Sequence, residues 1–289
     1  MILFIRLVKI TELSGREVII DNFSWNIIYI SAMRVIKSVF LIINYKTFIV
    51  TLLAVASTWL CGHYGFSADF PLTIIGIAIV FPVVFSIDSA YKRRERTLML
   101  LADFRGHCQA LYIASGQWLN TSDMEFQGLM KEDLVDIYKA LRAFCTNTKK
   151  SKKEAFEMQL FVKVSQLSQR IQLVRGKELN PGEISRMNQY VSKILVDIEN
   201  IKMIRTYRTP LTLRAYSRIF IYSFPIIYGP YFEYTASSYA HGLEYVMPVM
   251  FSFILISLDN IQEHLENPFD QIGEDDVKFD VEQLHAMLN

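Results

Sequence analysis

The feature that most constrains this chain is the segregation of its charges. Four stretches contain no Asp, Glu, Lys or Arg, and they cover residues 47–61, 70–87, 219–232 and 245–258. Charged residues are dense elsewhere, although 52% of all residues are hydrophobic. A soluble domain of this length would be more polar, so the pattern predicts a membrane part joined to a soluble part.

The charges beside the apolar stretches orient them. Residues 61–70 and 229–246, which connect the paired stretches, contain no Lys or Arg. The opposite ends of the stretches are basic and carry Arg34, Lys37, Lys92, Arg93, Arg94, Arg96, Arg205, Arg208, Arg214 and Arg218. Because basic residues remain on the cytoplasmic side, we expect a multi-pass protein of the cell (inner) membrane with four spans. Both termini and the long middle segment are then cytoplasmic.

The two outer connections are short and aromatic. Their aromatic residues, which suit the membrane–water interface, are Tyr64, Phe66, Tyr228, Tyr231, Phe232, Tyr234 and Tyr239. The shorter apolar stretches fall below the roughly 20 residues that a lone membrane helix needs. A bundle tolerates short spans because their polar ends can face other subunits or a wet pore.

The segment between the second and third stretches has the pattern of soluble helices. Apolar residues recur there at three- and four-residue spacing in two runs, which predicts two amphipathic helices. The first run is Met158, Phe161, Val164, Leu167, Ile171 and Val174. The second run is Ile184, Met187, Val191, Ile194 or Leu195, Ile198 and Ile201. Asn180 as the cap, Pro181 at the first helical position and Glu183 in the first turn predict where the second helix begins.

A cluster of lysines precedes the first run and consists of Lys149, Lys150, Lys152 and Lys153. Two interpretations are open: a solvated connection between helices, or a contact for an anionic lipid or a nucleotide. The chain as a whole divides into four parts. Residues 1–90 hold the N-terminal segment and two membrane helices, at about 44–62 and 70–90. A cytosolic helical region covers 91–215, two further membrane helices cover 216–258, and an acidic cytosolic tail covers 259–289.

Three passages together resemble the bestrophin family. The second apolar stretch and its exit read FPLTIIGIAI at 70–79 and FSIDSAYKR at 85–93, which resembles the pore helix of the family. Residues 209–211, TPL, lead into an aromatic third span. Leu258 and Asp259, then ENPF at 266–269, precede an acidic segment, as the family's Asn-Pro-Phe or Glu-Pro-Phe motif does. The three passages occur in the family's order and cover most of the chain.

The resemblance implies an all-α membrane protein that assembles as a homopentamer around a central pore. The second span of each subunit would line a narrow neck, and the cytosolic helices would enclose a wider vestibule. Ile77, Phe81 and Phe85 match the neck positions of the family, and their spacing of four residues places them in one stripe on a helix. Without the resemblance, such a stripe indicates ordinary helix packing.

Two further residues bear on the pore. Pro82 lies within the predicted pore helix, where it removes a backbone donor and predicts a kink. That kink is either a gating hinge or a static packing feature. Leu211 falls at the position of the family's cytosolic aperture, on the strength of the TPL passage. The basic residues near Leu211 either attract anions into the vestibule or only follow from the positive-inside pattern.

The resemblance also raises the question of calcium. Asn267 and Asp275 match parts of the calcium clasp that animal members have. The chain has an insertion at 270–272, however, and places Lys278 where an acidic ligand would fall. A lysine opposes a calcium site, which prefers six to eight oxygen ligands. A solvated acidic tail or a subunit contact is the competing interpretation, and we expect no other cofactor and no metal site.

The function implied is an oligomeric channel for small monovalent ions, either chloride or sodium and potassium. Its partners would be further copies of the chain, membrane lipid and the permeant inorganic ions, with no nucleic acid. The five histidines lack metal-ligand spacing, and the chain contains no GxSxG, P-loop or dinucleotide motif. We therefore expect no catalytic residues and no enzymatic activity. The alternative function is a non-conducting membrane scaffold or a sensor of the envelope.

Overall fold

The computed structural model describes residues 43–118, 124–147, 152–173, 180–208, 210–237, 243–271 and 276–288. Regular structure in these ranges is helical. The helices are α3 (Tyr45–Tyr64), α4 (Leu72–Gln117), α5 (Met124–Thr146), α6 (Lys153–Leu173), α7 (Pro181–Thr206), α8 (Leu211–Ile227), α9 (Gly229–Ser237), α10 (Leu243–Glu266) and α11 (Val281–Met287). The predicted all-α class is therefore confirmed for the described residues. The predicted basic residues Arg34 and Lys37 lie outside them.

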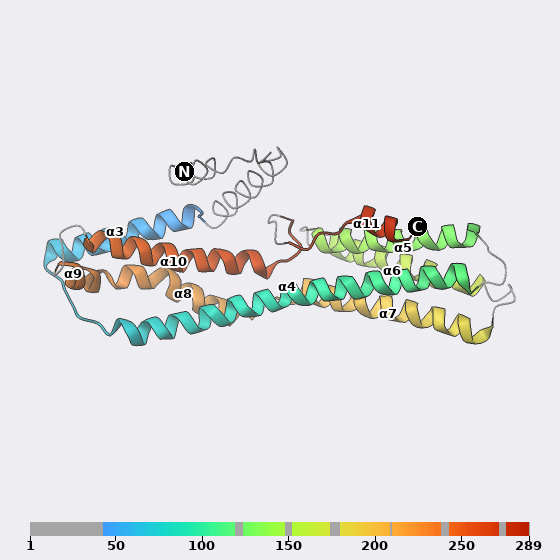
Figure 1. Cartoon of the computed structure of the whole chain (residues 1–289). Helices are drawn as coiled ribbons and strands as arrows, with labels where there is room; N and C mark the ends of the chain where they lie inside the picture. Colours follow the sequence, from blue (N-terminus) through green and yellow to red (C-terminus); the bar gives the residue numbers. More distant parts are fainter. Residues whose placement is uncertain are drawn as a thin grey trace, which may run out of the picture. The chain divides into compact units, whose positions relative to one another are not determined.

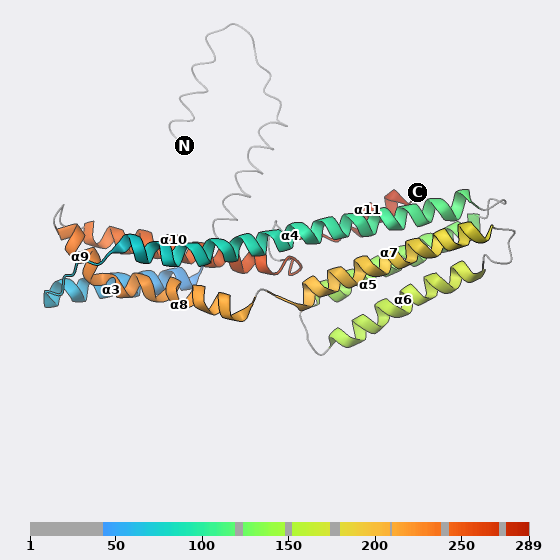
Figure 2. The same cartoon turned by 90° about the horizontal axis from the view of Figure 1, so that it is seen from below.

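The long helix α4 joins the two groups of helices. Its 46 residues extend for about 70 Å at 1.5 Å per residue. The helices α3, α8, α9 and α10 lie along its first part, and α5, α6, α7 and α11 lie along its second part (Figures 1 and 2). The helix continues far beyond the predicted apolar stretch because no proline follows Pro82 before its end. The basic exit at residues 92–96 is thus helical.

The first helix of the apolar group is bounded by local signals. Asn44 caps α3, since its side-chain oxygen accepts hydrogen bonds from the backbone N–H of Lys46 and of Thr47. Gly65 ends α3 in the left-handed conformation, with φ of 67°, a region that glycine enters without steric cost. The predicted first stretch, residues 47–61, lies entirely within α3.

The third apolar stretch is divided between α8 and α9 at Tyr228. Pro230 has no backbone N–H, so the hydrogen-bond ladder of α8 cannot continue past this point. Tyr228 is buried against Phe224, and Phe232 is buried against Phe251 of α10. Tyr64, Phe66 and Tyr234 are exposed. The position of these aromatic residues at the membrane interface stays a prediction.

The second group of helices encloses a separate apolar core. In α7, the buried residues include the whole predicted run, with Ile194 buried in preference to Leu195. Asn180 caps this helix and accepts from the N–H of Gly182, with Pro181 at the first position, as predicted. In α6, the face that packs inward is Leu160, Val164, Leu167 and Ile171, whereas Met158 is 66% exposed and Phe161 39%. The predicted face of α6 was therefore wrong at its start.

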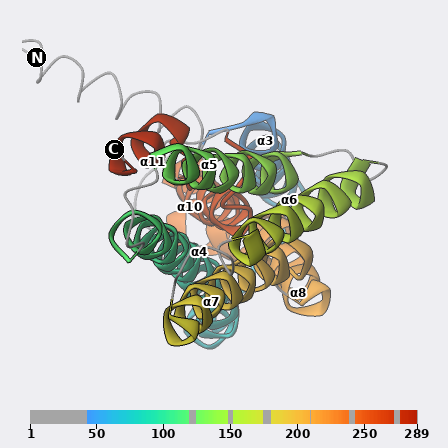
Figure 3. The ribbon, with the colours of Figure 1, turned by 90° about the vertical axis from the view of Figure 1, so that its right-hand side faces the viewer.

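The C-terminal segment packs back onto this second core. The N–H of Val277 donates to the carbonyl of Pro268 at 2.9 Å, and Phe269 and Phe279 are buried in ring contact. Phe279 also contacts Tyr138 of α5, and α11 lies beside α5 when the second helix group is viewed end-on (Figure 3). The acidic tail predicted after residue 258 therefore contains buried apolar anchors.

Two described helices are long and apolar enough to cross a membrane: Tyr45–Tyr64 and Glu244–Glu266. They contain the first and fourth predicted spans. Length and composition alone select these helices.

Candidate functional site

The first part of α4 carries a stripe of exposed apolar side chains. Ile77, Phe81 and Phe85 are 52%, 56% and 59% exposed, and the rings of Phe81 and Phe85 lie 6.1 Å apart between centroids. Val80 and Val84 beside them are also exposed. Large apolar side chains in such a row are costly to leave in water, so this face requires lipid, another copy of the chain, or a narrow pore.

The opposite face of α4 packs against its own subunit. Ile79 and Val83 are buried in a cluster with Ile221 and Phe224 of α8 and Leu255 of α10. One side of the helix is thus fixed by neighbouring helices, and the stripe lies on the other side. Pro82 lies within the continuous helix and is half-buried. Whether it acts as a hinge stays a prediction.

The exposed face continues past the apolar stripe into charged residues. In a helix of 3.6 residues per turn, Asp88 and Lys92 lie in line with Ile77, Phe81 and Phe85. Both are exposed, and their charged groups form an ion pair of 2.7 Å at a spacing of four residues. The same register places Glu95 on this line, 18 residues or five turns after Ile77, and its half-exposed carboxylate forms an ion pair with Arg94.

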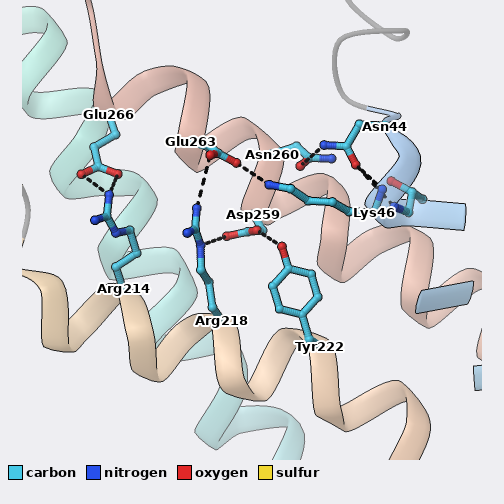
Figure 4. A network of polar contacts seen from close by, with 10 residues as sticks. Asn44, Lys46, Arg214, Arg218, Tyr222, Asp259, Asn260, Glu263 and Glu266 are labelled. Atoms are coloured by element: carbon cyan, nitrogen blue, oxygen red, sulfur yellow. Dashed lines mark hydrogen bonds and ion pairs between the residues drawn. The ribbon is translucent and has the colours of Figure 1, made fainter. Parts of the chain in front are cut away.

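A second constellation lies where α8, α10 and α3 meet at the ends nearer the second helix group (Figure 4). The helices α8 and α10 run antiparallel, so Arg214, Arg218 and Tyr222 along α8 face Glu266, Glu263 and Asp259 along α10. Arg214 donates from Nη1 to both carboxylate oxygens of Glu266, at 2.8 and 2.7 Å. The hydroxyl of Tyr222 donates to Asp259 at 2.7 Å.

Arg218 links two of the acids, because its Nε lies 3.4 Å from Asp259 and its Nη2 lies 3.5 Å from Glu263. Helix α3 joins the network through Lys46, whose Nζ lies 2.8 Å from Glu263. Asn44, the cap of α3, donates to the side chain of Asn260 at 2.8 Å. Three helices that are distant in sequence are thus held at one level by charged groups.

Two acids of this network, Asp259 and Glu266, are among the most buried charged groups described, whereas Glu263 is 49% exposed. The side chains of Asp259 and Glu266 are 1% and 4% exposed. A carboxylate can remain ionised there only because arginine compensates its charge. Sequence reasoning missed the network, since it assigned Asp259, Glu263 and Glu266 to a tail. Their spacing of four and three residues, matched by Arg214, Arg218 and Tyr222 at spacings of four, was the available signal.

The remaining predicted site residues that the structure describes lie at the ends of helices. Leu211 is the first residue of α8 and is 71% exposed, and its role as an aperture stays a prediction. Asn267 follows α10 and is half-buried, whereas Asp275 lies outside the described residues. Among the residues that the structure describes, His, Cys, Asp and Glu form no group of three that could hold a metal ion. The calcium question is therefore not tested.

Comparisons with known proteins identify the fold. No protein-family model matches the chain, and no curated protein matches it. Among solved structures, a bacterial bestrophin homologue from Klebsiella pneumoniae aligns with a TM-score of 0.72 and 15% identity, over 84% of this chain and 96% of that chain. A variant of that homologue in which a tyrosine is replaced by alanine aligns with a TM-score of 0.70 and 16% identity, over 87% of this chain and 97% of that chain. The crystal structure of a membrane-protein variant aligns with a TM-score of 0.73 and 15% identity, over 85% of this chain and 97% of that chain.

At this identity the likeness shows the fold alone. It extends over most of the described chain and includes both helix groups. The resemblance inferred from three short sequence passages is thus confirmed as a likeness of fold.

Proposed function

We propose that this chain is one subunit of a bestrophin-type ion channel. The observation that carries the proposal is the stripe of Ile77, Phe81 and Phe85 on α4, which is exposed although α8 and α10 bury the opposite face of the same helix. The fold supports it, since the chain shares it with a solved bacterial bestrophin homologue.

In a symmetric pentamer, the stripe would form three stacked apolar rings around a central axis. A ring of large apolar side chains in a narrow pore repels water and closes the pore to ions without complete steric contact. The membrane neck of the proposed channel is therefore Ile77, Phe81 and Phe85.

The proposed topology has four membrane spans: α3, the first part of α4, α8 together with α9, and α10. Two of these helices pass the length and composition test on their own. The other two are supported by the charge pattern, since Lys and Arg are missing from the proposed outer connections at 61–70 and 229–246. Both termini and the α5–α7 bundle are then cytoplasmic, and the four spans lie in the inner membrane.

The permeant ions would be small and monovalent, because apolar rings offer no ligands that would replace the hydration shell of a divalent ion. Asp88 and Lys92 on the pore-facing line of α4 would bias the passage of cations and anions in opposite directions. We propose no enzymatic activity, in keeping with a chain that has no GxSxG, P-loop or dinucleotide motif.

The experiment is a recording from the purified protein in planar bilayers. We expect a current in the unmodified protein and a larger or more persistently open current in Phe81→Ala and in Phe85→Ala, because the smaller ring holds water. Phe48→Ala is the matched control, since Phe48 is also exposed, at 69%, but lies on α3. An absence of current from all four proteins in chloride, sodium and potassium salts would contradict the channel and favour a non-conducting scaffold or envelope sensor.

A further inference from the structure

Basic side chains from three separate elements converge at the end of α7. Arg93 comes from α4, Lys152 and Lys153 from the start of α6, and Arg205 and Arg208 from the end of α7 and the residues after it. We call these five residues the basic cluster. Sequence alone places only Lys152 with Lys153, and Arg205 with Arg208, near each other.

Hydrogen bonds hold the cluster together. The guanidinium of Arg93 donates to the carbonyl of Ile204. Arg205 donates to the carbonyls of Cys145 and Asn147, at 2.8 and 2.9 Å, which ties α7 to the end of α5. The Nζ of Lys153 donates to the hydroxyl of Thr206 at 3.1 Å. The partners of the cluster are therefore neutral oxygens.

The positive charge of the cluster is not balanced by carboxylates. Half-buried Arg170 has Asp133 as an acidic partner and buried Lys202 has Glu157 and Glu199, whereas half-buried Arg105 donates to the neutral Gln283 and Tyr138. Within the described ranges, no carboxylate lies at ion-pair distance from any of the five cluster residues.

The charges within the cluster repel each other. Burial lowers the pKa of Arg93, and the nearby charges of Arg208 and Arg205 lower it further, against the opposing effect of Glu266. Glu266 itself is already bound by Arg214. The negative ends of the α5 and α7 dipoles offset part of this repulsion, whereas the N-terminus of α6 adds positive potential beside Lys153.

The cluster lies close to the ends of two proposed membrane spans. Arg208 precedes Leu211, the first residue of α8, by three positions. Arg93 follows residue 87, the end of the apolar stretch on α4, by six positions, or about 9 Å along the helix axis. Arg208 and Lys152 are exposed. Their long side chains can thus reach the level at which lipid headgroups begin.

We propose that the basic cluster binds the phosphate groups of anionic lipids in the cytoplasmic leaflet. Groups of basic residues immediately cytoplasmic to membrane helices attract anionic headgroups, and guanidinium pairs with phosphate through two parallel hydrogen bonds. An anion at this position relieves the repulsion between Arg93, Arg205 and Arg208. The inference rests on the membrane topology proposed above, but it does not require the protein to conduct.

The test is native mass spectrometry of the detergent-purified full chain with added phosphatidylglycerol or phosphatidylcholine. We expect selective retention of phosphatidylglycerol. The double variant Lys152→Gln/Arg208→Gln should weaken it by roughly 30-fold, because each basic side chain near an anionic surface contributes about fivefold. Neither residue makes a side-chain contact that holds the fold in the described chain, so thermal unfolding should be unchanged.

The matched control is Arg186→Gln/Lys193→Gln, which removes the same charge from exposed positions of α7 farther from the membrane. It should retain the lipid. Equal loss in both double variants, or equal binding of both lipids, would overturn the proposal. Displacement of phosphatidylglycerol by an equal concentration of glycerol 3-phosphate would indicate a site for a free phosphate and overturn it too. Lipid selectivity in a protein without current would sink the channel and leave this inference standing.

Discussion

The pairing of Arg214 with Glu266 shows how a single buried residue can bind two helices together. Glu266 is almost fully buried and Arg214 mostly so. Removal of one partner leaves the other charge buried without compensation, which costs about 3–5 kcal/mol, whereas replacement of both by apolar residues is often neutral. The pair is therefore a sharper test of the packing between α8 and α10 than any single apolar contact.

We predict that Glu266→Gln lowers the free energy of unfolding by about 3 kcal/mol, and that Arg214→Met/Glu266→Leu recovers most of the loss. Denaturant unfolding in detergent measures both. Asp136→Asn is the control for an exposed pair, since Asp136 is 42% exposed against Lys163, and it should cost less than about 1 kcal/mol. Equal losses in the single and double variants would show that the charge pairing does not hold the helices.

The burial of Asp197 predicts that the stability of the fold depends on pH. Asp197 of α7 is buried, and its carboxylate lies 2.6 Å from Nδ1 of His107 on α4. Burial raises the pKa of Asp197, as Asp103 does, whereas His107 and Lys193 act to lower it. The folded state therefore holds the proton of Asp197 more tightly than the unfolded state does, and stability falls as pH rises from the ordinary aspartate pKa through the raised value.

We predict that Asp197→Asn removes this part of the pH dependence, because asparagine does not titrate. The unfolding midpoint, measured as pH rises from the ordinary aspartate pKa, should depend on pH with a different slope in the two proteins. The unmodified protein should lose more stability per pH unit than the variant. Parallel profiles would contradict the assignment.

At the scale of elements, the two faces of α4 have different roles. The buried face fixes the helix against α8 and α10, so substitutions on the exposed face can change ion passage without unfolding the subunit. We predict that Asp88→Asn shifts the reversal potential in a salt gradient toward anions and that Lys92→Gln shifts it toward cations. Lys139→Gln, on α5, should leave it unchanged. A shift of both variants in the same direction would place this pair outside the conducting path.

The contact between α3 and α9 depends on a glycine. A Cβ at Gly229 would lie 2.6 Å from the hydroxyl of Ser57 and 3.1 Å from backbone atoms of Ser57 and Thr58. Ser57 also donates to the carbonyl of Ile226 at 2.7 Å, so it cannot move freely. Small residues permit such close approach between membrane helices.

We predict that Gly229→Ala lowers the unfolding free energy by about 1–3 kcal/mol, since the backbone of α3 must shift. Gly106→Ala is the matched control because nothing lies within 4 Å of its added Cβ, and it should stabilise α4 by up to about 1 kcal/mol. Thermal unfolding in detergent distinguishes the two by sign. A stabilised Gly229→Ala would show that the α3–α9 contact is looser than the structure has it.

The elements also show what the sequence can predict. The buried run and the cap of α7 follow from periodicity and local hydrogen bonding, so both were predicted correctly. The break at Tyr228 and the burial of Asp259 depend on contacts between distant segments, which composition does not reveal. For the same reason, apolar periodicity favoured Met158 and Phe161 in the first turns of α6, although tertiary packing buries Leu160 there.

At the scale of the whole molecule, a single copy of the chain leaves the apolar stripe on α4 without a partner surface. The stripe on α4 is exposed in the isolated subunit, and no residue of the described chain covers it. The fold accounts for the position of the stripe, but only an assembly can turn one stripe into rings. The proposed neck therefore depends on the proposed oligomer. Both can be wrong while the proposed lipid contact is right.

The last prediction concerns the number of chains in the assembly and the position of Phe85 within it. Mass photometry or light scattering in detergent should give a protein mass of five 33.5-kDa chains. In that assembly, cysteine introduced at Phe85 should form disulfides between copies, because the residues of a narrow ring lie close to one another, whereas cysteine at Phe48 on α3 should not. A background in which Cys61, the half-buried native thiol, is replaced by Ser removes a competing partner. A stable monomer, or cross-linking only at Phe48, would remove the central pore.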